Sequence, residues 1–285
     1  EKLKGDFPPW VVSNWGSDIS LFGRLADHKR KVNEVLSKCD YFTCDCERDI
    51  KLVRNHGFSG TVFPPSLGGG GFDLALCNSL RSPKKTSERR QIILKGYQGW
   101  SGRALVGLRA LRRCSSLLDG FQIFIFSASN EVRISAELFK SDTGIPISII
   151  PNGTSHMEIL RHQGESRVYL GLGISDGLPN ALLEAMIMGA FPIQSNTSCA
   201  DEWIQDGKTG ILVHPEDPQA IAAAIQRAVT DDTLVNRAAD INTRVAAERL
   251  DQSVIQPQVI EMYENVASQG SSARFDTIVR KSVKF

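Results

Sequence analysis

The chain has 285 residues and a mass of 31.3 kDa, which allows about two domains. Its 33 Lys and Arg against 32 Asp and Glu leave a net charge of +1, which argues against a dedicated nucleic-acid binder. No apolar run approaches the about 18 residues that a membrane span needs, and the charged, proline-rich start does not resemble a signal peptide. These properties predict a cytoplasmic protein of two domains.

The first 80 residues predict a small α/β region. Strands are expected at 10–13, 41–44 and 61–65, and helices at 18–38 and 47–56. The following segment, RSPKKTSERR at 81–90, has no apolar periodicity and contains Ser-Pro, so it is the predicted linker.

Residues 91–250 alternate regularly between strand and helix. Strands are predicted at 91–97, 121–128, 146–151, 167–174, 191–195 and 209–215. Helices are predicted at 102–119, 130–143, 155–163, 179–188, 217–231, 233–250 and 253–267. The strand cores at 123–126 and 147–150 are apolar on consecutive positions, which indicates burial on both faces. The fold class predicted here is therefore α/β, with a doubly wound parallel sheet that binds ligands beyond the carboxyl ends of its strands.

The six cysteines show one close cluster, Cys39, Cys44 and Cys46. Structural zinc sites usually pair two short Cys units, or one such unit with a His pair, and no second pair follows here. We expect buried, unbridged thiols and no metal site.

The segment Gly96 to Arg103 lies between a predicted strand and helix and resembles a nucleotide-binding turn. Tyr97 and Gln98 break the G-x-G-x-x-G spacing, which disfavours a nicotinamide cofactor. Lys95 and Arg103 bracket the turn, and they are either phosphate ligands or solvated cations. The Gly-Lys-Thr sequence at 207–209 lacks the earlier glycine of a phosphate-binding loop, so a tight turn is predicted there.

The most informative segment is SDGLPNALLEAM at 175–186. Pro179 suits the first turn of a helix, whose free amides suit a diphosphate. Glu184 lies in an otherwise apolar stretch, where a carboxylate is costly unless it is paired or bound to hydroxyls. Asp176 and Glu184 therefore fit the two ends of a nucleotide sugar, or else a capping Asp and a half-buried Glu. A further turn, Asn152 and Gly153 with His156, opens another helix, and His156 is either part of the turn or a ligand contact.

These motifs resemble a known family. The run D-G-x-P-x-x-L-L-E-A-M-x-x-G, then F-P-I at 191–193, D-G-K-T-G-I-L-V and P-x-D-P, looks like the donor domain of GT-B glycosyltransferases of the large retaining family 4, of the bacterial polysaccharide-biosynthesis type. The resemblance covers about 91–250 in order. It extends weakly to V-V-S-N-W-G-S-D-I at 11–19, which resembles an acceptor-domain loop. It implies a 1–80 partial acceptor domain, an 81–90 linker, a 91–250 donor domain and a 251–285 helix and tail that pack back on the N-terminal domain.

The resemblance also implies roles for residues. Glu184 would bind the ribose hydroxyls, and Asp176 would face the donor sugar. The donor would further contact residues of three loops: Gly177, Leu178, Pro179, Asn180, Gly96, Gly102, Asn152, Gly153 and His156. Lys95 and Arg103 would stabilise the leaving diphosphate without a metal, and Trp15, Gly16 and Asp18 would lie on the acceptor side.

Three departures from the family pattern stand out. Asp176 replaces the usual Glu, the expected Arg and Lys are displaced to Lys95 and Arg103, and Trp15 stands where the acceptor domain often has His. The expected activity is retaining transfer of a sugar from a UDP- or GDP-linked donor to a hydroxyl of a glycan or lipid-linked glycan, with no cofactor. The alternatives are a sugar-nucleotide epimerase and a nucleotide-sugar-binding protein without transfer activity. The basic tail Arg274 to Phe285 suggests peripheral contact with the inner membrane face, against the simpler reading of a solvated end.

Overall fold

The computed structural model describes residues 8–269, which form two compact units. The first unit combines residues 8–71 with 252–269, and the second holds residues 72–251. The basic tail Arg274 to Phe285, for which membrane contact is expected, lies outside the described residues.

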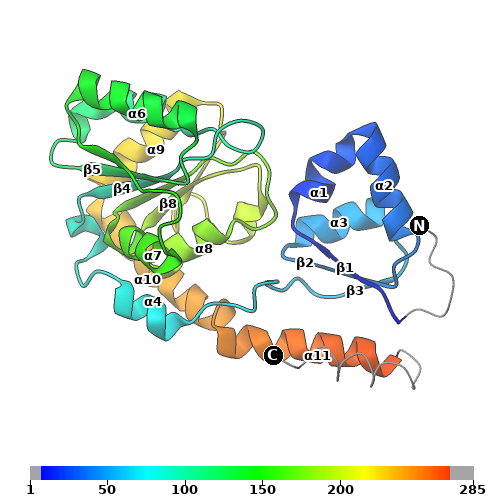
Figure 1. Ribbon diagram of the computed structural model, residues 1–285. Helices are drawn as coiled ribbons and strands as arrows, with labels where there is room; N and C mark the ends of the chain where they lie inside the picture. The colour runs from blue at the N-terminus through cyan, green and yellow to red at the C-terminus, as the bar shows by residue number, and fades with distance from the viewer. Residues whose placement is uncertain (1–7, 270–285) are drawn as a thin grey trace. The chain divides into compact units, whose positions relative to one another are not determined.

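The first unit is built on a short parallel sheet with the strand order β1-β2-β3, formed by β1 (Val11–Asn14), β2 (Tyr41–Cys44) and β3 (Thr61–Val62). Its helices are α1 (Ser17–Ser20), α2 (Ala26–Leu36), α3 (Glu47–Asn55) and α11 (Gln252–Gln269). The core gathers Phe42, Val53 and Phe58 between the sheet and its helices. Figure 1 shows β1 to β3 and α1 to α3 in blue.

The prediction of one continuous helix at 18–38 is wrong. The chain forms α1, a 3-10 turn at Phe22–Arg24, and then α2. Leu25 takes an extended backbone with φ −84° and ψ 131°, which ends one element and starts the next. The apolar spacing continues across this break, and so the pattern alone did not reveal it.

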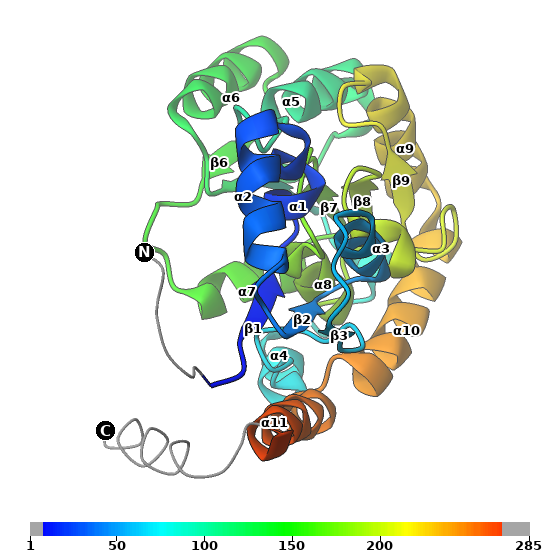
Figure 2. The same cartoon turned by 90° about the vertical axis from the view of Figure 1, so that its right-hand side faces the viewer.

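The second unit contains, within residues 72–251, a parallel sheet with the strand order β6-β5-β4-β7-β8-β9. Its strands are β4 (Gln91–Lys95), β5 (Gln122–Phe126), β6 (Ile147–Ile149), β7 (Val168–Gly171), β8 (Phe191–Ser195) and β9 (Ile211–Val213). The helices are α4 (Leu74–Leu80), α5 (Ala104–Arg113), α6 (Asn130–Thr143), α7 (His156–Glu165), α8 (Asn180–Ile187), α9 (Pro218–Thr230) and α10 (Asp232–Arg249). In Figures 1 and 2, α5, α6 and α9 cover one face of the sheet, while α7 and α8 cover the other. The prediction of a doubly wound α/β fold is confirmed for this unit.

The order of the strands fixes where a ligand can bind. The chain runs outward from β4 through β5 to β6, and then returns to pair β7 on the other side of β4. In doubly wound sheets the crevice lies at such a reversal, outside the carboxyl ends of the strands. The loops that follow β4 and β7 meet at this point, since Gly102 and Gly173 form an isolated antiparallel bridge.

The segment predicted as a linker, 81–90, lies inside the second unit, and the chain divides at Gly71 and Phe72 instead. Thr86 and Arg89 are buried, and the Thr86 hydroxyl donates to the Gly189 carbonyl at 2.7 Å. Arg89 donates to the carbonyls of Ser166 and Met188 at 3.2 and 3.1 Å. Hydrogen bonds from the side chains of this polar segment to distant backbone carbonyls thus hold it in place, although it shows no apolar periodicity.

All six cysteines lie in the described part of the chain, where they are buried and not bridged by disulfides, as predicted. Among the residues that the structure describes, no helix is both long and apolar enough to cross a membrane.

Candidate functional site

The loop between β7 and α8 carries the central motif. Pro179 is the N-cap of α8, and the first helical hydrogen bond runs from the Leu182 amide to the Pro179 carbonyl at 2.9 Å. The amides of Asn180 and Ala181 therefore precede the helical ladder and mark its positive end. This start lies beyond the carboxyl end of β7, as the sequence predicts.

Glu184 lies in the second turn of α8 and is 9% exposed, between side chains that are almost all apolar. Its Oε1 is 2.8 Å from His156 Nε2, and its Oε2 accepts weakly from Gln163 Nε2 at 3.4 Å. The hydrogen bond to Glu184 raises the pKa of His156, although partial burial opposes the shift. A nearly buried carboxylate thus lies in the helix that follows the carboxyl end of β7, and two side chains of α7 hold it in place.

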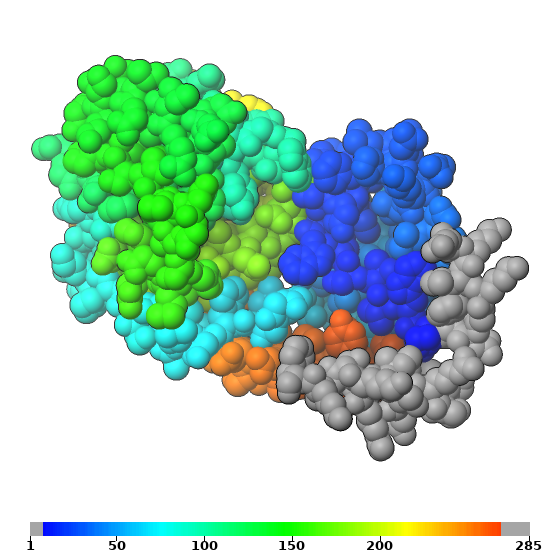
Figure 3. All heavy atoms as spheres, viewed as in Figure 1, coloured from blue at the N-terminus to red at the C-terminus, as the bar shows by residue number. Residues whose placement is uncertain are grey.

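Asp176 lies half-buried in the same loop, with its Oδ1 accepting from the Gly177 amide at 3.0 Å. The Gly177 carbonyl accepts from the Cys199 amide at 3.0 Å, and Leu178 is 4% exposed. These contacts fix the loop against the segment after β8. In Figure 3 the chain around 170–200, drawn in yellow-green, reaches the surface of this unit beside the green residues of α7.

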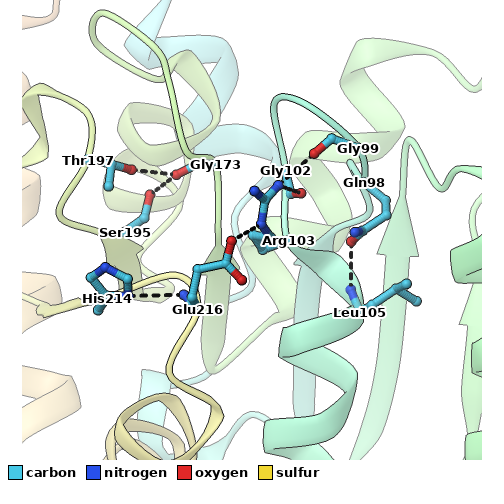
Figure 4. A network of polar contacts seen from close by, with 10 residues as sticks. All are labelled: Gln98, Gly99, Gly102, Arg103, Leu105, Gly173, Ser195, Thr197, His214 and Glu216. Atoms are coloured by element: carbon cyan, nitrogen blue, oxygen red, sulfur yellow. Dashed lines mark hydrogen bonds and ion pairs between the residues drawn. The ribbon is translucent and has the colours of Figure 1, made fainter. Parts of the chain in front are cut away.

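The loop after β4 is organised by Arg103, as Figure 4 shows. Its Nη1 donates to the carbonyls of Gly99 and Gly102 at 2.6 and 2.8 Å, and its Nε pairs with the Glu216 carboxylate. The Gln98 side chain accepts from the Leu105 amide at 3.1 Å and closes the start of α5. Arg103 is therefore engaged by its own loop and by Glu216.

Other residues of this loop also make contacts within the protein. Lys95 Nζ stands 4.6 Å from the centroid of the Tyr97 ring, a cation–π contact. A Cβ on Gly96 would lie 2.7 Å from the Cα of Ala128, and one on Gly102 would lie 2.2 Å from the Tyr97 carbonyl oxygen. Both glycines are thus needed for close backbone packing, whatever ligand the loop meets.

The turn after β6 places Asn152 and Gly153 at the surface, ahead of α7. Gly153 has a φ of 89°, a left-handed conformation that glycine adopts without strain. Ser155 is the N-cap of α7, and its hydroxyl accepts from the Glu158 amide at 3.3 Å. His156 follows as the first helical residue, and its imidazole reaches Glu184 rather than the turn.

The residues expected on the acceptor side belong to the first unit. Trp15 is 66% exposed, and its amide donates to Asp18 Oδ2 at 3.4 Å. Gly16 has a φ of 101° and precedes α1. Trp15 and Gly16 form the turn at the carboxyl end of β1, and Asp18 lies in the following helix, α1.

Three residues near the site were missed by the sequence analysis. Gln163 is fully buried against Glu184, Glu216 pairs with Arg103, and the Tyr169 hydroxyl lies buried beneath the loop, where burial raises its pKa. Gln163 follows His156 at i+7, the spacing of one helix face, and this signal was available in the sequence. Glu216 is 113 positions from Arg103 in the sequence, so no local sequence pattern predicts that ion pair.

Comparisons with known proteins find similarity to glycosyltransferases. Residues 141–231 match the family model described as glycosyl transferases group 1. A phosphatidyl-myo-inositol mannosyltransferase from Mycobacterium leprae is 32% identical over 93 residues, which are 33% of this chain and 25% of the relative. The residues matched by the family model include β7 and α8, and the match to the mannosyltransferase spans about a quarter of that protein's length.

Solved structures resemble the described fold over most of its length. HepE from Anabaena, solved with UDP and glucose, has a TM-score of 0.68 at 16% identity, covering 90% of this chain and 71% of that one. A UDP-forming trehalose-phosphate synthase from Burkholderia xenovorans has a TM-score of 0.71 at 13% identity, covering 91% and 69%. TarM has a TM-score of 0.70 at 11% identity, and the chain spans 50% of its length. At these identities the likeness shows the fold, which is the Rossmann-like GT-B type.

Proposed function

We propose that this protein is a GT-B glycosyltransferase that binds a nucleoside diphosphate sugar at the carboxyl edge of the second unit. The observation that carries the proposal is the nearly buried Glu184 carboxylate, one turn behind the open amides of α8. A buried carboxylate needs hydrogen-bond donors, and vicinal ribose hydroxyls supply two. The helix start ahead of it suits the diphosphate of the same ligand.

The remaining roles follow from position. Asp176, on the same loop, would face the donor sugar, with Gly177 to Asn180 along the diphosphate. We assign residues 72–251 to the donor, and Trp15, Gly16 and Asp18, at the junction of β1 and α1, to the acceptor. Arg103 would assist the leaving diphosphate once the ligand competes with Glu216, and Lys95 would do so by leaving the Tyr97 ring.

Several finer features belong to the same proposal. Transfer would proceed with retention, as the family resemblance implies. It would need no metal, because helix amides and two cations would meet the developing charge. The donor would be UDP- or GDP-linked, in line with the UDP found in HepE. The acceptor would be a glycan or lipid-linked glycan of polysaccharide biosynthesis. The reaction would take place in the cytoplasm, at the inner membrane face where the acceptor is lipid-linked.

One observation favours a second candidate, a nucleotide-sugar-binding protein without transfer activity. Both candidate cations are engaged within the protein, Arg103 by Glu216 and Lys95 by Tyr97. Such a protein would bind the donor tightly and leave it intact across a panel of hydroxyl acceptors. Transfer of a labelled sugar to any acceptor would exclude it.

The first prediction concerns Glu184. Glu184→Gln keeps the volume of the side chain but turns one acceptor oxygen into a donor, so affinity for the nucleotide should fall about tenfold to 100-fold, the worth of hydrogen bonds to a charged group. Calorimetric titration with UDP-glucose and GDP-mannose measures this change.

Glu137→Gln, on the exposed side of α6, is the matched control and should bind as the wild type does. Equal affinity of Glu184→Gln and wild type would contradict the assigned site. Failure of UDP-, GDP- and ADP-sugars alike to bind the wild type would contradict the proposed function itself.

A further inference from the structure

The carboxylate of Glu184 is held from one side by a single helix. His156 and Gln163 stand at i and i+7 on α7, and both reach across to α8. His156 supplies the short contact of 2.8 Å to Oε1, and Gln163 the longer one of 3.4 Å to Oε2. Two donors from one rigid helix fix both the position and the rotation of a planar carboxylate.

The two donors differ in their surroundings. Gln163 is fully buried, and its Nε2 also lies 3.4 Å from the Ala181 carbonyl of α8. The His156 side chain is 63% exposed, against 11% for the Glu184 side chain. Gln163 is therefore a permanent part of the α7–α8 packing, whereas His156 stands open to solvent and can exchange protons with it.

We infer that α7 positions Glu184 for the ribose of the donor through His156 and Gln163, and that the charge on His156 makes donor binding depend on pH. The inference rests on the proposed function, because it assigns Glu184 to the ribose. His156 acts through Glu184, and so it is a positioning residue. This differs from the expectation that His156 contacts the ligand directly.

The direction of the effect follows from the donor capacity of imidazole. Protonated imidazole donates from both nitrogens, whereas the neutral ring donates from Nε2 in only one of its tautomers. The hydrogen bond to Glu184 raises the pKa of His156, so the charged form persists to a higher pH than in an unpaired histidine. The added positive charge also favours an anionic diphosphate. Donor affinity should therefore fall as the pH rises through this raised pKa.

Few other groups can titrate beside His156. The elements packed against α7 are α4, α8 and β4. On α8 the charged residue is Glu184 itself. Burial, followed by nearby Asp73 and Glu184, raises the pKa of the Cys77 thiol of α4 to about 11, which keeps it neutral. The charged or titratable residues of these elements and of α7 are Glu184, Cys77 with Asp73 before α4, Lys95 on β4, and Glu158, Arg161, His162 and Glu165 on α7 itself.

The test compares the wild type with His156→Gln and His156→Ala by calorimetry with UDP-glucose and GDP-mannose. The diphosphate esters of these ligands keep a constant charge over the pH range used. Wild type should bind about threefold more tightly at about pH 6 than at about pH 8.5, a change of the size expected for an exposed charge. His156→Gln retains a neutral donor and should lose this pH dependence. His156→Ala should bind about tenfold more weakly at both pH values, because the donor itself is gone.

Glu158→Gln is the matched control on the same helix, and it should keep the wild-type pH dependence. The inference would be overturned if donor affinity varied with pH in the same way in the wild type and in His156→Gln. It would also be overturned if His156→Ala bound the donor as tightly as the wild type does. A second readout needs no ligand: the pKa of His156, followed by NMR, should fall toward that of an ordinary histidine in Glu184→Gln. An unchanged pKa of His156 would overturn the inference and leave the proposed function standing. If the wild type bound none of the nucleotide sugars, both the proposed function and the role of His156 in binding them would be contradicted.

Discussion

At the scale of single residues, the loop between β7 and α8 depends on a glycine that ends β7. A Cβ on Gly171 would lie 2.0 Å from Gln194 Oε1 and 2.7 Å from the Tyr169 hydroxyl, both in the buried layer beneath the loop. Neither neighbour is free to retreat, since Tyr169 is fully buried and Gln194 is 2% exposed. Polar side chains from β7 and β8 thus fill the space that a larger residue would need.

The prediction for this position is a loss of stability. Gly171→Ala should lower the free energy of unfolding by about 1 to 3 kcal/mol, the range for forcing extra volume into a packed interior. Chemical denaturation of the two proteins measures it. Gly173→Ala is the control in the same loop, because a Cβ there meets only the Ser101 carbonyl oxygen at 3.6 Å. A Gly171→Ala protein as stable as Gly173→Ala would contradict the packing argument.

At the scale of elements, the sequence predicted the strand–helix alternation well and the polar connection poorly. The strands of the second unit are buried on consecutive positions, and Gly144 and Gly189 stand in the left-handed conformation just after their helices, so local signals were sufficient. Residues 81–90 looked like a linker because their contacts are made by polar side chains to distant carbonyls. Such long-range hydrogen bonds leave no periodic pattern in the sequence.

The role of this segment gives a testable prediction. Arg89 is 3% exposed, and burial, together with nearby Arg81, lowers its pKa to about 10, which still leaves it charged at neutral pH. Arg89→Met would leave buried carbonyls without a donor and should cost about 3 kcal/mol of stability. The adjacent Arg90 is exposed, with its guanidinium 5.3 Å from the Phe121 ring centroid, so Arg90→Met should cost less than about 1 kcal/mol.

Thermal and urea unfolding of both variants separate the two cases. If Arg89→Met and Arg90→Met unfolded alike, residues 81–90 would behave as the solvated linker that their composition suggests.

The candidate site shows the same limit of sequence reasoning. Asp176 and Glu184 lie on one loop and helix, and their pattern revealed them. The partner of Glu184 is 28 positions away on another helix, and that of Arg103 is 113 positions away. The sequence therefore predicted which groups carry charge at the edge of the sheet, but not which contacts hold each of them.

At the scale of the whole molecule, the chain consists of a second unit with a complete doubly wound sheet and a first unit with a much smaller one. The sequence predicted this inequality from the motifs, which fill residues 91–250 and thin out before residue 80. It placed the division at 81–90, whereas the chain divides at Gly71 and Phe72 and again at Asp251 and Gln252. Residues that form the donor site under our proposal all belong to the second unit.

The central claim is that a nucleotide sugar binds at the start of α8, against Glu184. Hydrogen–deuterium exchange with and without saturating UDP-glucose or GDP-mannose, whichever binds more tightly, tests it most directly. The account predicts slower exchange in peptides covering 172–188 and 152–163, and unchanged exchange in 81–90. Protection confined to other segments, with 172–188 unaffected by a bound nucleotide sugar, would contradict the account.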